Sequence, residues 1–129
     1  MWMAAAPSLR ILVVDDDPIQ LRAAARVLRE LGCAGALANR GEMALQLLDE
    51  QAFDAVLLDL RMPGLSGMET LAQLRVKKPA LPVVFVSGDD LSVSWAYYEK
   101  AGANGCLTKP LDMEALSALL GRLLRLGPS

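Results

Sequence analysis

The sequence predicts a doubly wound α/β domain, in which a five-stranded parallel sheet of strand order 2-1-3-4-5 carries helices on both faces. Two patterns support this prediction. Short apolar runs alternate five times with longer stretches whose apolar residues recur at helical spacing, and the 129 residues have the length of one domain. Four of the runs end in polar residues, and a sheet of this kind gathers the carboxyl ends of its strands along one edge.

Five strands and five helices are expected in alternation. The first strand is an apolar run broken only by Arg10, which is typical of a strand buried on both faces. The second is weaker because it has few β-branched residues, whereas the fourth is mostly β-branched. In chain order, the expected strands and helices span residues 9–14, 18–31, 33–38, 42–50, 55–58, 68–76, 83–86, 91–100, 105–108 and 112–126.

The expected starts and ends of these elements carry suitable residue types. Asp17 can cap the first helix, with Pro18 in its first turn, and Gly32 is its natural stop. Pro82 marks the turn into the fourth strand, and Gly102 closes the fourth helix. Alternating units of this kind, which show no internal repeat, are joined by right-handed crossovers into the flavodoxin-like arrangement.

Composition excludes several classes of protein. Hydrophobic residues make up 53% of the chain, so a compact fold is expected, and the net charge of -2 gives no reason to expect nucleic-acid binding. The absence of His removes histidine metal sites and histidine general bases. Cys33 and Cys106 lack the spacing of metal ligands, and we expect them to be buried, reduced thiols of a cytoplasmic protein.

The two ends of the chain are expected to lie outside the domain. Residues 1–8 are short and apolar but have neither a basic start nor a long hydrophobic run, so they fail as a signal peptide and as a membrane span. We expect a flexible leader over residues 1–8, the domain over residues 9–126 and a tail over residues 127–129.

Three carboxylates are expected to meet where the first and third strands end, namely those of Asp15, Asp16 and Asp59. Two like charges about 4 Å apart repel by roughly 4 kcal/mol at an effective dielectric constant near 20. Such a cluster therefore either takes up a proton or binds a cation. Because no His or Cys ligand accompanies the carboxylates, an all-oxygen site favours Mg²⁺ before Ca²⁺.

Asp59 is the best candidate for a nucleophile in this sequence. It follows the third apolar run and precedes a loop with Gly and Pro that can leave its carboxylate exposed, and aspartate serves as a covalent acceptor of phosphoryl groups. Lys109, after the fifth strand, would pair with a transferred phosphoryl group, and the Ser87 hydroxyl would donate a hydrogen bond to it. The Lys109–Pro110 bond is a candidate for cis geometry.

Together these motifs resemble those of response regulator receiver domains. The similarity covers about residues 9–125, and it is carried by the segments Ile11–Pro18, Leu57–Gly64, Ser66–Gly67, Val86–Gly88, Gly102–Ala103 and Thr108–Pro110. The resemblance implies that a sensor histidine kinase or histidine phosphotransfer protein donates a phosphoryl group to Asp59 with Mg²⁺ bound. The domain would then control an effector protein or an output domain. It would be a signalling phosphoacceptor and not an enzyme, since it catalyses only its own phosphorylation and dephosphorylation.

The resemblance also implies a set of metal ligands. Asp16 and Asp59 would bind Mg²⁺ through their side chains, and Asp15 would act largely through water. Arg61 would contribute its backbone carbonyl oxygen. The cofactor expected from the resemblance is therefore the same Mg²⁺ that the carboxylate cluster predicts.

Further roles follow from position within the family pattern. Ser87 matches the hydroxyl position of the family, and Lys109 matches its lysine position. Arg61 and Asp89 lie two residues beyond Asp59 and Ser87, where the family tunes the lifetime of the acyl phosphate. We expect Arg61 and Asp89 to pair and to hinder attacking water.

One departure from the family concerns the switch. In receiver domains the position of Cys106 is usually aromatic, and the ring turns inward when the hydroxyl residue, here Ser87, engages the phosphoryl group. A thiol is too small for this, so we hypothesise that activation relies on movement of the fourth helix, where Trp95, Tyr97 and Tyr98 supply bulk. For Trp95 and Tyr98, ordinary packing explains the sequence equally well. The face made by the fourth helix, fifth strand and fifth helix is also a candidate homodimer surface.

Two alternatives stay open at this point. A Mg²⁺-dependent phosphohydrolase of the haloacid-dehalogenase type also combines aspartates after strand one with a Ser or Thr and a Lys, and residues 15–17 and Ser87 fit it loosely. However, that family places its nucleophile on the first strand and needs a later acidic pair, which does not follow Lys109. The other alternative is a non-phosphorylated interaction module of receiver shape, which Cys106 keeps open.

Overall fold

The structure, a computed structural model, describes residues 9–124. Five parallel strands form one sheet in the order β2-β1-β3-β4-β5, so the predicted fold class and topology are confirmed. The strands are β1 (Arg10–Val14), β2 (Ala34–Ala38), β3 (Ala55–Asp59), β4 (Val83–Ser87) and β5 (Gly105–Thr108), and the helices are α1 (Pro18–Glu30), α2 (Gly41–Glu50), α3 (Gly67–Lys77), α4 (Trp95–Ala101) and α5 (Met113–Leu124). The expected leader, the expected tail and the expected helical residues 125 and 126 lie outside the described residues.

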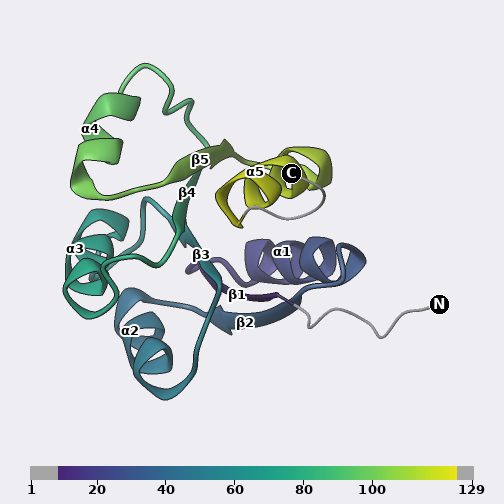
Figure 1. The fold of residues 1–129 in the computed structure, drawn as a ribbon, viewed down its shortest axis with the longest axis horizontal. Coiled ribbons are helices and arrows are strands. Elements are labelled where there is room, and N and C mark those ends of the chain that lie inside the picture. The colour runs from purple at the N-terminus through teal and green to yellow at the C-terminus, as the bar shows by residue number, and fades with distance from the viewer. Residues whose placement is uncertain (1–8, 125–129) are drawn as a thin grey trace.

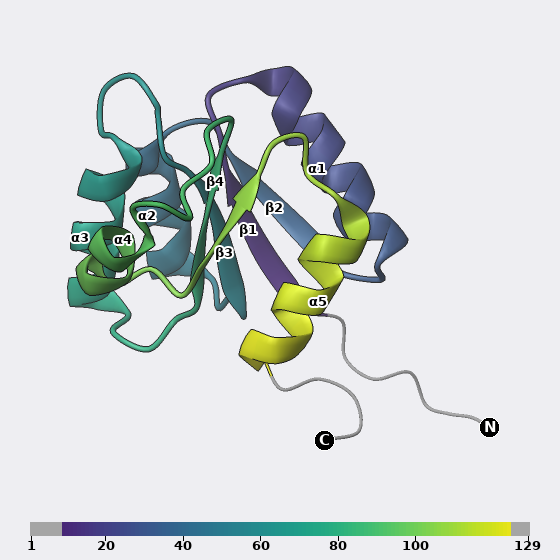
Figure 2. The ribbon, with the colours of Figure 1, turned by 90° about the horizontal axis from the view of Figure 1, so that it is seen from above.

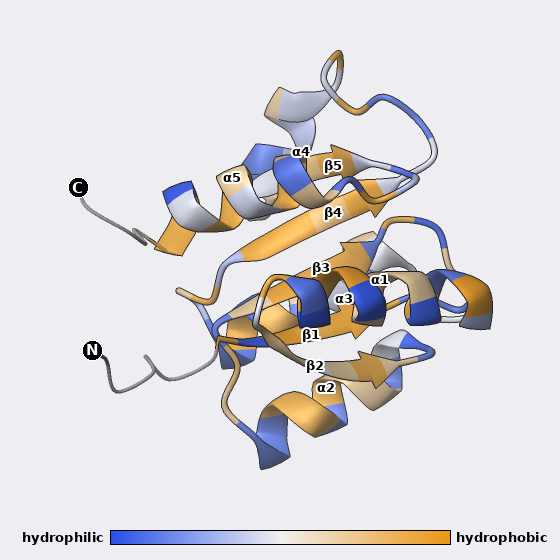
Figure 3. Ribbon diagram, turned by 90° about the vertical axis from the view of Figure 1, so that its right-hand side faces the viewer, coloured by the Kyte–Doolittle hydropathy of each residue, from blue (hydrophilic) through white to orange (hydrophobic). Residues whose placement is uncertain are grey.

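The helices cover both faces of the sheet. α1 and α5 lie on one face, and α2, α3 and α4 lie on the other (Figures 1 and 2). Because successive strand residues point to opposite faces, β1 sends Ile11 and Val13 into the core on the α1 and α5 side, and Leu12 and Val14 into the core on the other side. The central strands are accordingly hydrophobic along most of their length (Figure 3). Within residues 9–124, no helix has the length and apolar character needed to cross a membrane.

Local side-chain and glycine chemistry sets where three helices begin or end. Asp17 caps α1 as predicted, because its carboxylate accepts a hydrogen bond from the Ile19 N–H at 2.9 Å. Ser66 and Glu69 form a reciprocal capping box at the start of α3. Gly102 closes α4 with a φ of 114°, a left-handed conformation that favours glycine. Asp17 and Ser66 lie at the carboxyl edge of the sheet, whereas Gly102 lies at the opposite edge, where β5 begins.

The fourth helix is shorter than predicted. α4 begins at Trp95, whereas the apolar pattern suggested a start at Leu91. The Asp90 carboxylate accepts a hydrogen bond from the Ser92 N–H at 2.9 Å, and such a local turn competes with helix formation. Leu91 is only 6% exposed, so it anchors the loop to the core instead of belonging to a helical stripe.

The prediction of two buried thiols was wrong. Cys33, directly before β2, and Cys106, in β5, are both free and only half-buried. The physical reason is the topology, because β2 and β5 are the two outer strands of the sheet and each has a single neighbouring strand. Residues on these strands are therefore covered less completely than those on β1, β3 and β4.

Candidate functional site

Two acidic side chains lie at the carboxyl ends of neighbouring strands. Asp59 is the last residue of β3, and Asp15 directly follows β1. The Asp15 N–H donates to the Ala38 carbonyl oxygen at 3.1 Å, so the pairing between β1 and β2 extends to this residue. Asp15 and Asp59 are 5% and 6% exposed, whereas Asp16 is at the surface. The fold thus holds two carboxylates inside the protein and a third beside them in contact with solvent.

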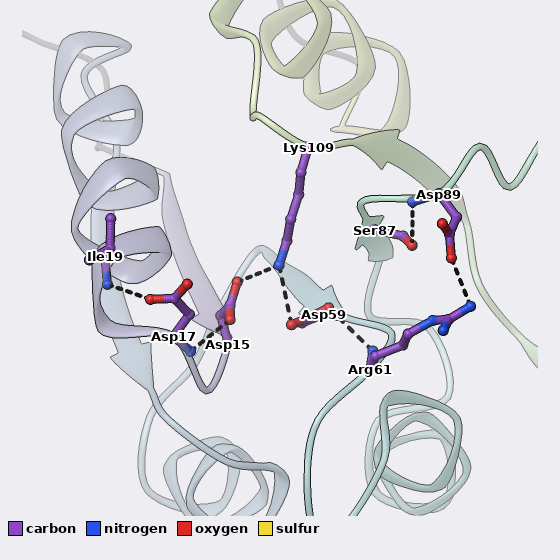
Figure 4. A network of polar contacts seen from close by, with 8 residues as sticks. All are labelled: Asp15, Asp17, Ile19, Asp59, Arg61, Ser87, Asp89 and Lys109. Atoms are coloured by element: carbon purple, nitrogen blue, oxygen red, sulfur yellow. Dashed lines mark hydrogen bonds and ion pairs between the residues drawn. The ribbon is translucent and has the colours of Figure 1, made fainter.

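Lys109 joins the two buried carboxylates. Its Nζ lies 2.9 Å from Asp15 Oδ2 and 3.2 Å from Asp59 Oδ2, between the ends of β1 and β3 (Figure 4). Its backbone N–H donates to the Ser87 carbonyl oxygen at 2.7 Å, which fixes the point from which the side chain extends. The Lys109–Pro110 peptide bond is cis, as the sequence suggested. Three of the predicted site residues therefore form one ion-pair cluster.

The other oxygen of each buried carboxylate accepts a hydrogen bond from the backbone. Asp15 Oδ1 lies 2.9 Å from the Asp17 nitrogen, and Asp59 Oδ1 lies 3.2 Å from the Arg61 nitrogen. Each carboxylate therefore has one oxygen on an amide of its own loop and one oxygen on the Lys109 ammonium. This arrangement fixes the orientation of both groups.

The buried cluster has two carboxylates but only one ammonium group, so negative charge exceeds positive charge. Burial raises the pKa of Asp59, the Asp15 charge adds to this effect, and the Arg61 N–H and Lys109 oppose it incompletely. Burial also works against the charged form of Lys109, but its hydrogen bond to Asp15 and the charges of Asp59 and Asp15 outweigh burial and raise the pKa of Lys109. The ammonium thus stays charged, yet it does not fully compensate two carboxylates.

The cluster has the donor set of a hard divalent cation. Asp15, Asp16 and Asp59 each offer a carboxylate oxygen, and these oxygens lie within 4.8 Å of one another. Oxygen ligands without nitrogen or sulfur are those that Mg²⁺ prefers, and Mg²⁺ commonly uses only one or two carboxylates together with water and phosphate oxygens. The residues present therefore fit the cation that the sequence predicted.

The fourth strand supplies a hydroxyl next to this cluster. Ser87 is the last residue of β4 and is 3% exposed, and its Oγ accepts a hydrogen bond from the Asp89 N–H at 3.1 Å. The Asp89 carboxylate lies 2.7 Å from the Arg61 guanidinium, so the expected Arg61–Asp89 pair is present (Figure 4). Side chains from the ends of β1, β3, β4 and β5 therefore meet at one edge of the sheet, as the topology predicted.

Residues 11–121 match the sequence pattern of the response regulator receiver domain. The chain belongs to this family. The match covers most of the receiver domain described above, including every residue named in the acidic, hydroxyl and lysine positions.

The receiver domain is similar to parts of longer signalling proteins. Transcriptional regulatory protein ZraR of Escherichia coli K12 is 38% identical over 117 residues, which are 91% of this chain and 26% of ZraR. Sensor histidine kinase RcsC of Salmonella typhi is 38% identical over 112 residues, which are 87% of this chain and 12% of RcsC. The chain therefore spans about a quarter or less of these two relatives.

A solved structure shows the same fold. The receiver domain of sensor histidine kinase PA1611 from Pseudomonas aeruginosa PAO1 aligns with a TM-score of 0.83 at 27% identity, covering 93% of this chain and 100% of that one. That structure contains a magnesium ion coordinated in its active site cleft.

In this receiver domain, the region of the expected switch is only loosely filled. Cys106 pairs with Phe85 across β5 and β4, and burial, with the nearby charge of Asp90, raises the pKa of its thiol. A groove of about 460 Å³ lies beside Cys106, between α4 and α5, and Trp95 is among its lining residues. Tyr98 packs against Phe85 with ring centroids 5.7 Å apart, which is ordinary core packing.

Sequence reasoning missed residues that line the inner side of the site. Gln20 and Ala23 of α1 and Leu111 border a cavity of about 20 Å³, together with Asp59 and Lys109. The available signal was the position of Gln20 and Ala23 at the start of the helix that follows Asp15. Their role was missed because helical spacing alone does not show which side of α1 borders the carboxylates.

Proposed function

We propose that this chain accepts a phosphoryl group on Asp59, in the presence of Mg²⁺, from a sensor histidine kinase or a histidine phosphotransfer protein. The single observation that carries the proposal is the position of Lys109, whose ammonium bonds both Asp15 and Asp59. An ammonium group that lies between two carboxylates can pair with a phosphoryl group attached to either one. We assign Asp59 as the acceptor because β3 lies between β1 and β4, so that Asp59 at its end lies between Asp15 and Ser87.

The transfer itself exchanges one bond for another. An Asp59 carboxylate oxygen forms a bond to phosphorus while the bond between phosphorus and the imidazole nitrogen of the donor histidine breaks, and that nitrogen keeps the electron pair. Lys109 then pairs with the phosphoryl oxygens, and the Ser87 hydroxyl turns from the Asp89 N–H to donate to the same group. Arg61 and Asp89 limit the access of water and so lengthen the life of the acyl phosphate.

The proposed Mg²⁺ site uses residues that already surround the carboxylate cluster. Asp16 and Asp59 would hold the ion through their side chains, Arg61 through its backbone carbonyl oxygen and Asp15 largely through water. When bound, the ion supplies positive charge that offsets the charge of phosphoryl oxygens next to the aspartates. Asp15 keeps its hydrogen bonds to Asp17 and Lys109 and orients both loops around the site.

Phosphorylation would act through the fourth helix. α4 has no fully buried residue, so its attachment to the core is weak, and Trp95 and Tyr98 supply its main contacts. Tyr97 is 65% exposed and can meet a partner. In place of an aromatic switch at Cys106, engagement of Ser87 would shift the loop between β4 and α4, and with it the populations of two α4 positions.

The partners of the domain follow from its family and its faces. We expect it to control an effector protein or an output domain, and to use the surface of α4, β5 and α5 if it forms a homodimer. Direct binding of nucleic acid is not part of this proposal. The domain would extend over residues 9–126 and act in the cytoplasm, the compartment that its free thiols suggest.

Mass spectrometry after incubation with acetyl phosphate and Mg²⁺ tests the proposal. We expect one phosphoryl addition on wild type, located at Asp59, and none on Asp59→Asn. Multiple turnover without a phosphorylated protein would instead indicate a hydrolase, and an unmodified protein would indicate an interaction module. The family match and the relatives described above do not support either of these alternatives.

A further inference from the structure

A small cavity borders the inner side of the carboxylate cluster, on the face of the sheet that α1 and α5 cover. Val13, Leu57 and Val86, which line it, belong to the core on that face. Four polar side chains also line it, namely those of Asp15, Gln20, Asp59 and Lys109. Its volume of about 20 Å³ is enough for one water molecule, which needs about 10–15 Å³ and about two to four polar partners. The cavity therefore has the size and the polar groups of a water site.

The Lys109 ammonium has one N–H group more than it has acceptors within the protein. It carries three donors, and two of them bond Asp15 Oδ2 at 2.9 Å and Asp59 Oδ2 at 3.2 Å (Figure 4). Residues 9–124 give this ammonium no third acceptor. The Lys109 side chain is only 21% exposed, and polar groups in such places normally have a partner. A water molecule in the cavity supplies one.

Gln20 brings an amide group to the same cavity from α1. Gln20 is half-buried, and its amide forms no hydrogen bond with another residue in the described part of the chain. The turn that carries it is fixed, because Asp17 caps α1 and Leu21, the next residue, is buried. The amide carbonyl oxygen accepts hydrogen bonds and the amide NH₂ donates them. Gln20 is therefore placed to hold a water molecule next to Lys109.

We propose that this cavity holds one water molecule and that Gln20 is a positioning residue, which fixes Lys109 through that water. The third Lys109 N–H donates to the water oxygen, and one water O–H donates to the Gln20 carbonyl oxygen. This inference rests on the proposed function and adds a residue outside the acidic, hydroxyl and lysine positions described above.

The water leaves the ammonium one bond to exchange. Two of its N–H groups are held, one by Asp15 and one by the water, so the remaining one stays directed at Asp59. When a phosphoryl group forms on Asp59, this N–H turns to a phosphoryl oxygen while the other two bonds stay in place. A group that is positioned before the reaction loses less freedom in the transition state, which raises the rate. Gln20 thus speeds phosphorylation without touching the phosphoryl group.

A crystal structure that resolves ordered water tests the water site. In the wild-type protein without Mg²⁺, we expect one water in the cavity, within hydrogen-bond distance of Lys109 Nζ and of the Gln20 amide. In Gln20→Met, whose side chain has a similar length but no amide, we expect this water to be lost. A wild-type cavity without water, or a direct bond between Gln20 and Lys109, would overturn the inference.

The rate at which acetyl phosphate and Mg²⁺ label Asp59 tests the positioning role. Gln20→Met should lower the maximal rate about fivefold and leave the half-saturating concentration of acetyl phosphate unchanged. Its melting temperature should stay the same or rise, because an apolar side chain replaces an amide beside apolar cavity residues. Gln73→Met is the matched control, since Gln73 is exposed on α3 and does not line the cavity, and it should be labelled at the wild-type rate.

Gln20→Glu separates the hydrogen bond from the shape of the side chain. It keeps an acceptor oxygen in nearly the same place, so its maximal rate should stay within about twofold of that of the wild type. Its negative charge should raise the half-saturating concentration of the anionic donor. An equal loss of maximal rate in Gln20→Met and Gln20→Glu would show that the accepted hydrogen bond is not the cause, and it would overturn the positioning role.

Two further results would also overturn the positioning role. One is an equal maximal rate for Gln20→Met and Gln73→Met, and the other is a loss of rate in Gln20→Met that is accompanied by a lower melting temperature, which indicates a structural role. A wild-type protein that acetyl phosphate does not label at Asp59 would contradict the proposed function instead. The crystal structure would still decide whether the water site exists.

Discussion

The Arg61 guanidinium lies 2.7 Å from the Asp89 carboxylate and joins the loop after β3 to the loop after β4. The two side chains are 79% and 61% exposed, so their contribution to stability is small, about 0–1 kcal/mol. The position of the pair matters more than its energy, because Arg61 and Asp89 flank the carboxylate of Asp59 and the hydroxyl of Ser87 (Figure 4).

Arg61→Ala should shorten the lifetime of the acyl phosphate by about threefold, because water then reaches the site more easily. The measurement is the decay of phosphorylated protein after the phosphodonor is removed, followed by mass spectrometry or ³¹P NMR. Lys77→Ala is the matched control, since it breaks another exposed ion pair, that with Asp49 at 2.9 Å. Equal or slower loss of phosphate in Arg61→Ala would contradict the assigned role.

Asp59→Asn should raise the melting temperature of the Mg²⁺-free protein by a few degrees. Burial holds the pKa of Asp59 above its ordinary value of 3.8. The folded state therefore binds this proton more tightly than the unfolded state, and the wild type loses stability as pH rises from 3.8 through the raised pKa. The amide carries no charge and avoids this loss. Thermal unfolding in EDTA measures the difference in melting temperature between Asp59→Asn and wild type. This difference should grow over this pH range and stay constant above it.

Addition of Mg²⁺ should make the wild type more stable than Asp59→Asn, which reverses the order of their melting temperatures. A ligand at one hundred times its dissociation constant stabilises the folded state by about 2.7 kcal/mol. The wild type should gain this stabilisation, whereas Asp59→Asn should gain much less because one charged ligand is missing. A magnesium response of equal size in both proteins would place the ion elsewhere.

Gly67→Ala and Gly121→Ala should change stability in opposite directions. A Cβ atom at Gly67 would lie 2.5 Å from the Asp59 carbonyl oxygen and 2.8 Å from Leu60, so we expect a loss of about 1–3 kcal/mol and slower labelling of Asp59. A Cβ atom at Gly121 in α5 meets no atom within 4 Å, so helix propensity should stabilise that variant by about 0.5–1 kcal/mol. Urea unfolding measures both changes.

When a phosphoryl mimic binds, the beginning of the fourth helix should move more than its end. Arg75 donates hydrogen bonds to the Gly102 carbonyl oxygen at 2.7 and 3.0 Å, which fixes the end of α4. Its beginning has no side-chain cap. In a Trp2→Phe background, where Trp95 is the remaining tryptophan, beryllofluoride with Mg²⁺ should change the emission of Trp95. Asp59→Asn should show no change, and an unmoved α4 in a structure with the mimic would rule out the switch hypothesis.

The sequence predicted the parts of the fold that depend on local chemistry. Apolar runs identified all five strands, and Asp17, Gly102 and the cis bond before Pro110 were predicted correctly from residue type. The edge at which the site residues meet was also predictable, since parallel topology fixes it once the strand order is chosen. These features need no knowledge of how distant side chains contact one another.

Features that depend on distant contacts were predicted poorly. Leu91 fits a helical stripe, but its burial in a loop depends on core residues that other segments contribute. The exposure of Cys33 and Cys106 depends on their strands being outermost. Likewise, no local pattern shows that Gln20 faces the same cavity as Lys109. In each case the deciding neighbours are far away along the chain.

The ammonium of Lys109 has a consequence for how the protein is made in the cell. Because it already lies between Asp15 and Asp59, part of their repulsion is relieved by a covalently attached counterion. Folding of the chain would then not require the proposed Mg²⁺, and the ion would bind to a domain that is already folded. If the proposed function holds, a shortage of the metal would stop phosphorylation of Asp59 while leaving the supply of folded protein intact.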